Sequence, residues 1–105
     1  MDAGSLFSNV PTALLDEFTE ILVSGQDVTV ERIVSHGHRS PDGFWYDQDR
    51  SEWVMVVSGN AKIEFADGAI RDMNPGDWVT ISPHEKHRVS WTNPECDTCL
   101  LYTSD

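Results

Sequence analysis

The stretch from Glu52 to His87 most constrains the fold, because short β-type runs alternate there with turn residues. The runs at 53–57, 61–65 and 78–81 are separated by turns at 58–60, 67–68 and 74–77. Gly and Asn supply the positive-φ positions that tight hairpins need, and β-branched residues fill the runs between them. The pattern predicts an antiparallel meander with a glutamate at the start of one strand and a histidine at the end of another.

Further strands are predicted on both sides of this stretch. Residues 28–34 alternate, with Thr29, Glu31 and Ile33 on one face of the predicted strand. Residues 44–48 form a short aromatic run, and the runs 88–91 and 98–103 follow the central stretch. About eight to ten short strands at regular spacing, without internal repeats, predict a β-sandwich or a small barrel.

One helix is predicted, in the N-terminal part of the chain. Between Pro11 and Ser24 the apolar residues recur at helical spacing, and Gly25 offers a C-terminal stop. They are Leu14, Leu15, Phe18, Ile21 and Leu22. We therefore expect residues 1–27 to form a lead and a capping helix, and residues 28–105 to form the β-domain.

Length and charge narrow the function classes. A chain of 105 residues has room for one domain with a modest core. Its 18 acidic and 7 basic residues give a net charge of −11, which disfavours binding to nucleic acids and to anionic membranes. No apolar run approaches the ~20 residues that a membrane span needs, and no signal peptide opens the chain. We expect a cytoplasmic protein whose partner is a small molecule.

Cys96 and Cys99 form a single C-x-x-C pattern, which in a cytosolic protein indicates redox chemistry or half of a zinc site. The segment that follows is strand-like, however, and residues i and i+3 of a strand point to opposite faces. We expect two unrelated cysteines beside a turn.

The central stretch resembles the cupin superfamily, whose two motifs are G-x5-H-x-H-x3,4-E-x6-G and G-x5-P-x-G-x2-H-x3-N. Six residues separate Glu52 from Gly59, as at the end of the first motif, and ten separate Gly76 from His87, as in the second. The resemblance covers residues 28–103. It implies an all-β jelly-roll barrel, a double-stranded β-helix, here with one short N-terminal helix, and it implies a homodimer.

The first motif is degenerate. Its two histidine positions hold Trp45 and Asp47, or Tyr46 and Gln48, depending on the spacing that is taken. In the second motif Ser82 replaces the proline, His84 the glycine and Trp91 the asparagine. We expect His84 to be a surface residue near the mouth of the barrel.

The family's metal site consists of three histidines and one glutamate, which suit Fe, Mn, Ni, Cu or Zn as divalent ions. Only Glu52 and His87 match it here. The resemblance makes Asp47 a possible replacement ligand and Gln48 a weaker one. His36, which forms an H-x-H with His38, is a further candidate if its loop folds toward the barrel.

Two functions from different classes follow. One is a metal-dependent dioxygenase, isomerase or lyase. The other is a metal-free small-ligand-binding module, in which Trp45, Tyr46 and Trp91 line an apolar cavity. Without metal, a hydrogen-bonded pair of His87 and Glu52 would still be an acid–base couple in a cavity.

Overall fold

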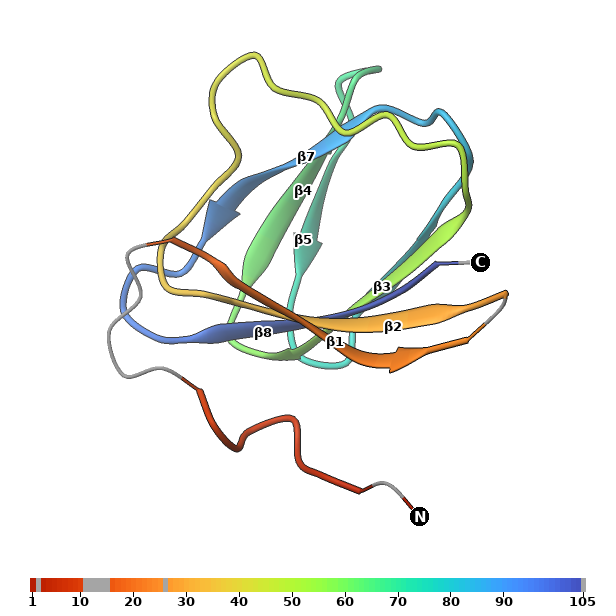
Figure 1. The fold of residues 1–105 in the computed structure, drawn as a ribbon. Coiled ribbons are helices and arrows are strands. Elements are labelled where there is room, and N and C mark those ends of the chain that lie inside the picture. Colours follow the sequence, from red (N-terminus) through yellow and green to blue (C-terminus); the bar gives the residue numbers. More distant parts are fainter. Residues whose placement is uncertain (2, 11–15, 26, 105) are drawn as a thin grey trace.

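The computed structural model describes residues 1, 3–10, 16–25 and 27–104, and this part of the chain contains eight strands and no helix. The strands are β1 (Phe18–Ser24), β2 (Thr29–Ser35), β3 (Glu52–Ser58), β4 (Ala61–Phe65), β5 (Ile70–Met73), β6 (Trp78–Ile81), β7 (His87–Thr92) and β8 (Thr98–Ser104). They form two antiparallel sheets, a five-stranded one in the order β1-β2-β8-β3-β6 and a three-stranded one in the order β5-β4-β7 (Figure 1). Two facing antiparallel sheets with such crossovers confirm the predicted jelly-roll barrel.

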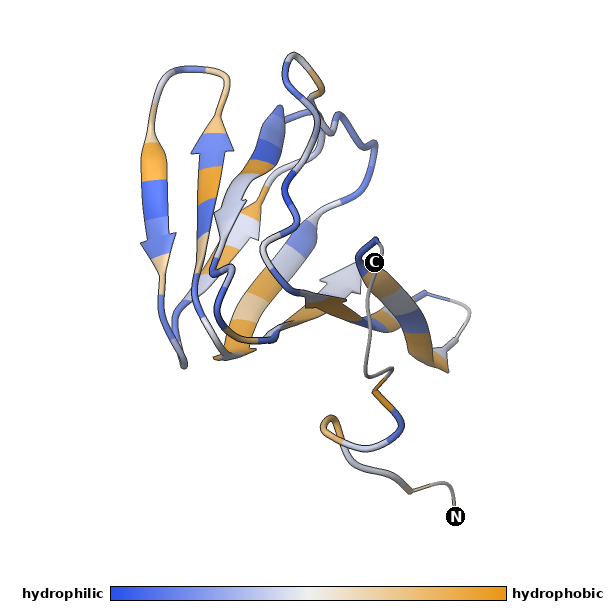
Figure 2. Cartoon of the chain, turned by 90° about the vertical axis from the view of Figure 1, so that its left-hand side faces the viewer, coloured by the Kyte–Doolittle hydropathy of each residue, from blue (hydrophilic) through white to orange (hydrophobic). Residues whose placement is uncertain are grey.

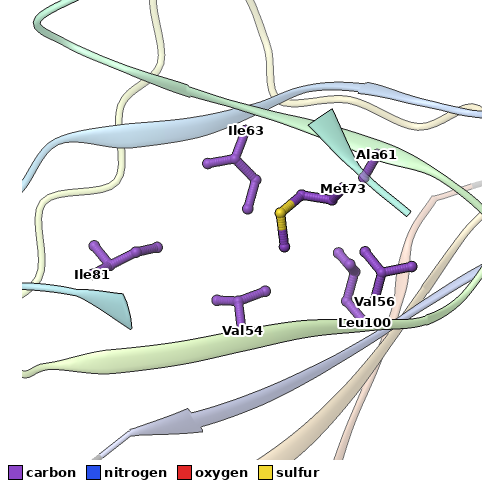
Figure 3. Packing of buried hydrophobic residues seen from close by; sticks show 7 residues of the cluster. All are labelled: Val54, Val56, Ala61, Ile63, Met73, Ile81 and Leu100. Atoms are coloured by element: carbon purple, nitrogen blue, oxygen red, sulfur yellow. The ribbon is translucent and has the colours of Figure 1, made fainter. Parts of the chain in front are cut away.

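The core lies where the two sheets face each other, and strand alternation selects its residues. Figure 2 shows hydrophobic and hydrophilic residues alternating along several strands. The buried cluster consists of Val54, Val56, Ala61, Ile63, Met73, Ile81 and Leu100, each at most 2% exposed. In Figure 3 the Met73 side chain extends into the space between Ile63 of β4 and Val54 of β3. Burying these side chains contributes about 1.5–3 kcal/mol for each large one.

The β3–β4 hairpin depends on Gly59. This residue has a φ of +78°, in the left-handed region that only glycine adopts at little cost. A Cβ at Gly59 would lie 2.6 Å from the Cα of Thr98 and 2.7 Å from the carbonyl oxygen of Asp97. The turn therefore packs directly on the backbone at the start of β8 and leaves no room for a side chain.

The predicted N-terminal helix is wrong over the residues that the structure describes. Phe18–Ser24 forms β1, an edge strand that pairs antiparallel with β2. The physical reason is that Thr19, Ile21 and Val23 are β-branched and the edge of β2 offers backbone partners, so pairing overrides the weak helical periodicity. The remainder of the predicted helix, residues 11–15, lies outside the described residues.

The N-terminal residues run along the outside of the larger sheet (Figure 1). Arg32 of β2, whose side chain is 1% exposed, fixes them there. Its Nη1 donates to the carbonyl oxygens of Leu6 and Ser8 at 2.8 and 2.9 Å. Its Nη2 donates to Glu20 at 3.0 Å.

The other predicted strands agree with β2, β3, β4, β6, β7 and β8 within one or two residues, except the aromatic run at 44–48. There the structure has a single β-bridge, between Tyr46 and His87. None of the described residues belongs to a helix that could cross a membrane.

Candidate functional site

A cavity of about 280 Å³ opens between the two sheets. Its lining consists of Glu17, Thr19, Thr29, Glu31, Ile33, Tyr46, Gln48, Glu52, His87, Val89, Leu100, Tyr102 and Ser104. Alternate residues of three strands supply most of it, because every second side chain of a strand points to the same face. The register places Glu31 of β2 directly opposite Tyr102 of β8. Strand pairing therefore builds most of the cavity, and Glu17, Tyr46 and Gln48 from segments outside the strands complete it.

Glu52 and His87 are the most buried polar residues of this lining, with side chains 9% and 4% exposed. The Nε2 atom of His87 lies 3.5 Å from Oε1 of Glu52. The other ring nitrogen, Nδ1, lies 2.9 Å from the carbonyl oxygen of Glu85. A carbonyl oxygen only accepts, so Nδ1 carries the hydrogen and the neutral ring presents the Nε2 lone pair toward the cavity.

Gln48 is the second partner of Glu52. With its amide nitrogen turned toward Glu52, it donates to Oε2 at 2.9 Å and to Oε1 at 2.6 Å. The opposite orientation would set the amide oxygen against both carboxyl oxygens, and at least one of these has no hydrogen to offer in either protonation state. Gln48 therefore fixes the orientation of the Glu52 carboxyl group.

Aromatic rings form the wall beside this pair. The Tyr46 ring stacks on the His87 ring with centroids 5.5 Å apart and an angle of 24° between the planes. The bridge holds the two backbones together, since Tyr46 N donates to His87 O at 2.7 Å and His87 N to Tyr46 O at 3.1 Å. Phe65 contacts the His87 ring at 6.4 Å between centroids. The imidazole is thus held by packing as well as by its hydrogen bond.

Burial and like charges raise the pKa of several lining groups. Burial raises the pKa of the Glu52 carboxyl group, the nearby Glu31 adds to the rise, and His87 opposes it. Burial also raises the pKa of Glu17 and of the phenols of Tyr46 and Tyr102. Both tyrosines therefore remain neutral hydrogen-bonding groups at physiological pH.

The structure brings Glu52, His87, Gln48 and Tyr46 together in the cavity lining, but it places Asp47 elsewhere. Asp47 points out of the cavity, and its Oδ1 lies 2.8 Å from Nδ1 of His84. His84 is 67% exposed, as expected, and its backbone nitrogen donates to the Gln48 carbonyl oxygen at 2.6 Å. The Asp47–His84 pair braces the 82–87 loop against the segment that carries Gln48.

His36, Trp45 and Trp91 also lie outside the described lining of the cavity. His36 is exposed and pairs with Asp97, with 3.0 Å between Nδ1 and Oδ1. The guanidinium of Arg88 lies 6.0 Å from the Trp45 ring centroid, and the ammonium of Lys62 lies 5.9 Å from that of Trp91. These two tryptophans form cation–π contacts instead of narrowing the cavity.

Sequence reasoning did not include Glu31, Tyr102 and Glu17 among the site residues. For Glu31 the signal was present, because the alternation of residues 28–34 already grouped it with Thr29 and Ile33, its neighbours in the cavity lining. Tyr102 required the register of β8, and Glu17 required the course of the chain before β1, neither of which a local pattern contains.

The donors in this part of the molecule do not fit the family's metal centre. Within residues 1, 3–10, 16–25 and 27–104, no three His, Cys, Asp or Glu side chains are grouped so that they could hold a metal ion. Gln48 donates hydrogen bonds to both carboxyl oxygens of Glu52. Asp47 pairs with the exposed His84, and His36 pairs with the exposed Asp97. Cys96 and Cys99 are both free thiols, and Cys99 is buried in β8.

Comparisons with known proteins agree with this fold. A crystal structure from Ralstonia eutropha is 45% identical, with 99% of this chain and 97% of that chain covered and a TM-score of 0.94; the proposed activity of that protein is mannose-6-phosphate isomerase. An RmlC-like cupin protein from Desulfovibrio desulfuricans is 14% identical, with 99% and 95% of the two chains covered and a TM-score of 0.79. A Klebsiella pneumoniae protein with a double-stranded β-helix domain is 15% identical, with 99% and 89% covered and a TM-score of 0.80.

No functionally curated protein matches the chain. The family model described as the cupin domain matches residues 31–103, which include all of β3 to β7, most of β2 and β8, and all but four of the residues that line the cavity. On the sequence match and the fold together, this chain belongs to the cupin family.

Proposed function

We propose that the barrel binds a small organic molecule and that Glu52 and His87 move a proton on it without a metal ion. The observation that carries this proposal is the buried pair itself, with Nε2 of His87 3.5 Å from Oε1 of Glu52 at the wall of a cavity. A proton-transfer site commonly contains a base and an acid, and burial raises the pKa of Glu52, the acid of this pair.

An isomerisation of an α-hydroxy carbonyl compound suits this pair, because it needs neither oxidant nor co-reactant. Nε2 of His87 removes the proton from the carbon beside the carbonyl group, and the C–H electron pair forms the double bond of an enediol. Protonated Glu52 gives its proton to the carbonyl oxygen at the same time. A proton then returns to the former carbonyl carbon, and the hydroxyl group on the carbon that was first deprotonated loses its hydrogen to become the new carbonyl group, which completes the isomerisation.

Two features support these roles. The Nδ1 hydrogen bond to Glu85 leaves the Nε2 lone pair on the cavity side, as a base requires. Burial raises the pKa of Glu52, which favours the protonated form that an acid requires. The 45% identical protein from Ralstonia eutropha carries an isomerase as its proposed activity, and that class of reaction agrees with ours.

The test is deuterium exchange in D2O, followed by NMR, with glycolaldehyde, mannose and mannosamine as substrates. We expect deuterium at the carbon beside the carbonyl group, and a rate that falls by about 10²–10⁴-fold in His87→Gln, the range for loss of a general base. His84→Gln is the matched control, since it removes an exposed imidazole of the same barrel mouth. Equal exchange rates in the wild type and His87→Gln would contradict the proposal.

A metal-dependent reaction is the second candidate function. Glu52 and His87, which match the glutamate and one histidine of the family's metal site, favour it. Adding Fe(II), Mn(II), Ni(II), Cu(II) or Zn(II) to chelator-treated protein separates the two. Exchange that requires one of these ions would replace our metal-free proposal with the metal-dependent one.

A further inference from the structure

The lining of the cavity contains acidic side chains, whereas the neighbouring arginines of β2 and β7 do not belong to it. Glu17, Glu31 and Glu52 all belong to its lining. Among the residues that the structure describes, no Lys or Arg lines it. His87 is therefore the sole lining group, in that part of the chain, that can carry a positive charge.

Strand alternation fixes this distribution. Arg32 stands between Glu31 and Ile33 on β2, and both of these neighbours line the cavity, so the arginine points to the opposite face. There it binds the Leu6 and Ser8 carbonyl oxygens and Glu20. An arginine held by three hydrogen bonds on the far side of the sheet cannot serve a ligand in the cavity.

The second arginine follows the same rule. Arg88 stands between His87 and Val89 on β7, both of which line the cavity. Its guanidinium turns away and binds Glu64 at 3.2 Å and the Ser40 carbonyl oxygen at 2.9 Å. Neither strand can present its arginine to the cavity without a one-residue shift of register.

We propose that the natural ligand of this cavity carries a protonated amine, and that the cavity rejects phosphorylated and carboxylated compounds. Glu31, which faces the cavity opposite Tyr102, is the counter-ion of the amine. A phosphate group would meet like charges without a cationic partner, which costs free energy in a partly desolvated site. The site therefore does not suit the phosphate ester in the proposed activity of the Ralstonia eutropha protein.

Buried groups aimed into the cavity give independent support. The imidazole of His87 is 4% exposed and lines the cavity, and its Nε2 has no partner within hydrogen-bond geometry in the described residues, only Glu52 at 3.5 Å. A hydrogen-bond donor on a ligand, such as a protonated amine, can therefore reach this nitrogen from the cavity. The stacked rings of Tyr46 and His87 offer a surface that attracts an organic cation when the imidazole is neutral.

This inference rests on the proposed function for the location of the ligand and adds its chemical class. The cavity, at about 280 Å³, is slightly smaller than the usual range for ligand sites, about 300–1,000 Å³, so the ligand is small. An amine-bearing hydroxy carbonyl compound would satisfy both the charge of the site and the proton transfer at Glu52 and His87.

The experiment uses two sets of probes. Within each set the molecules share one carbon skeleton and differ in charge. One set is benzylamine, benzyl alcohol and benzoate, and the other is mannosamine, mannose and mannose 6-phosphate. Binding is followed through the NMR resonances of His87 and Tyr102 at low salt and at pH 7. We expect the amine to bind at least about tenfold more tightly than the anion in each set, because one favourable charge contact replaces a repulsive one.

A substitution at Glu31 tests whether the cavity lining causes this preference for amines. Glu31→Gln should weaken the binding of benzylamine about fivefold and leave that of benzyl alcohol unchanged. Glu95→Gln is the control, since it changes the net charge equally on an exposed loop away from the cavity.

Two results would overturn the inference: an anion that binds as tightly as its amine, or resonances that no amine shifts at millimolar concentration. Failure of the proposed function is a different result. In that case the amines bind with the expected preference, but no deuterium exchange depends on His87.

Discussion

Oε1 of Glu52 and Nε2 of His87 face each other at 3.5 Å across the wall of the cavity, while Nδ1 of His87 is committed to the carbonyl oxygen of Glu85. Burial raises the pKa of Glu52, which favours a protonated carboxyl group beside the Nε2 lone pair. A ligand that approaches the pair therefore meets an acid and a base in one site.

The first prediction concerns the dependence of stability on pH. Burial raises the pKa of Glu52 above its ordinary value of 4.5, so the folded state binds a proton more tightly than the unfolded state. The contribution is fully present below pH 4.5 and is lost as the pH rises through the folded pKa. We expect the free energy of unfolding of the wild type to fall over this window relative to that of Glu52→Gln, as measured by urea unfolding at a series of pH values.

Glu95→Gln is again the control, because an exposed carboxyl group should leave the wild-type pH profile unchanged. A wild-type profile that rises relative to Glu52→Gln from pH 4.5 upward would show that the Gln48 and His87 contacts outweigh burial, and that Glu52 is ionised in the folded protein.

The second prediction isolates the contact between the β3–β4 turn and β8. Gly59→Ala should lower the free energy of unfolding by at least about 2 kcal/mol more than Gly68→Ala, because its Cβ meets the backbone of Thr98 and Asp97. Gly68→Ala is the matched control, since Gly68 also has a positive φ, +95°, but an added Cβ there has no atom within 4 Å. That control should cost about 1–2 kcal/mol from backbone strain alone. Equal losses in urea unfolding would mean that the turn moves away from β8 at little cost.

The strands from β2 to β8 could be predicted from sequence because their signals are local. Gly59, Gly68 and Gly76 mark turns, and the residues between them alternate or are β-branched. Phe18–Ser24 was predicted incorrectly because its apolar spacing fits a helix and a strand alike, and only the edge of β2 decides between them. The partner that decides lies in another part of the chain.

The residues of the candidate site also differ in whether a local sequence signal or a distant contact places them. Glu52 and His87 were found through motif spacing, which a sequence contains. Asp47 and Gln48 are neighbours that point to opposite sides of an extended segment, so spacing alone could not tell which one reaches Glu52. Glu31 lies opposite Tyr102 because of the register between β2 and β8, and no sequence motif contains that register. The homodimer stays a prediction.

The third prediction separates Asp47 from Gln48. Asp47→Asn should leave amine binding and deuterium exchange unchanged and should cost at most about 1 kcal/mol in urea unfolding, because its pair with His84 is exposed. Gln48→Leu should reduce exchange by about tenfold or more, since it removes both hydrogen bonds that orient Glu52. A larger loss in Asp47→Asn, reversed by adding a divalent metal ion, would instead support Asp47 as the replacement ligand.

The fourth prediction concerns the anchor that holds residues 3–10 against the sheet. Arg32 donates to the carbonyl oxygens of Leu6 and Ser8, and its guanidinium lies 5.6 Å from the Phe18 ring centroid. Arg32→Met keeps most of the side-chain volume and removes the donors. We expect the free energy of unfolding to fall by about 2 kcal/mol, the range for hydrogen bonds to a charged group, and amide hydrogens of residues 3–10 to exchange faster in mass spectrometry.

Glu20→Gln is the control for this fourth variant, because it removes the ionic partner of Arg32 but leaves both carbonyl contacts. Glu20 is 40% exposed, so its loss should cost less than about 1 kcal/mol and should not change exchange in residues 3–10. Faster exchange there in Glu20→Gln than in Arg32→Met would mean that the ion pair, and not the carbonyl contacts, anchors the segment. Because Arg32 is also turned away from Glu31, neither variant should alter the preference of the cavity for amines.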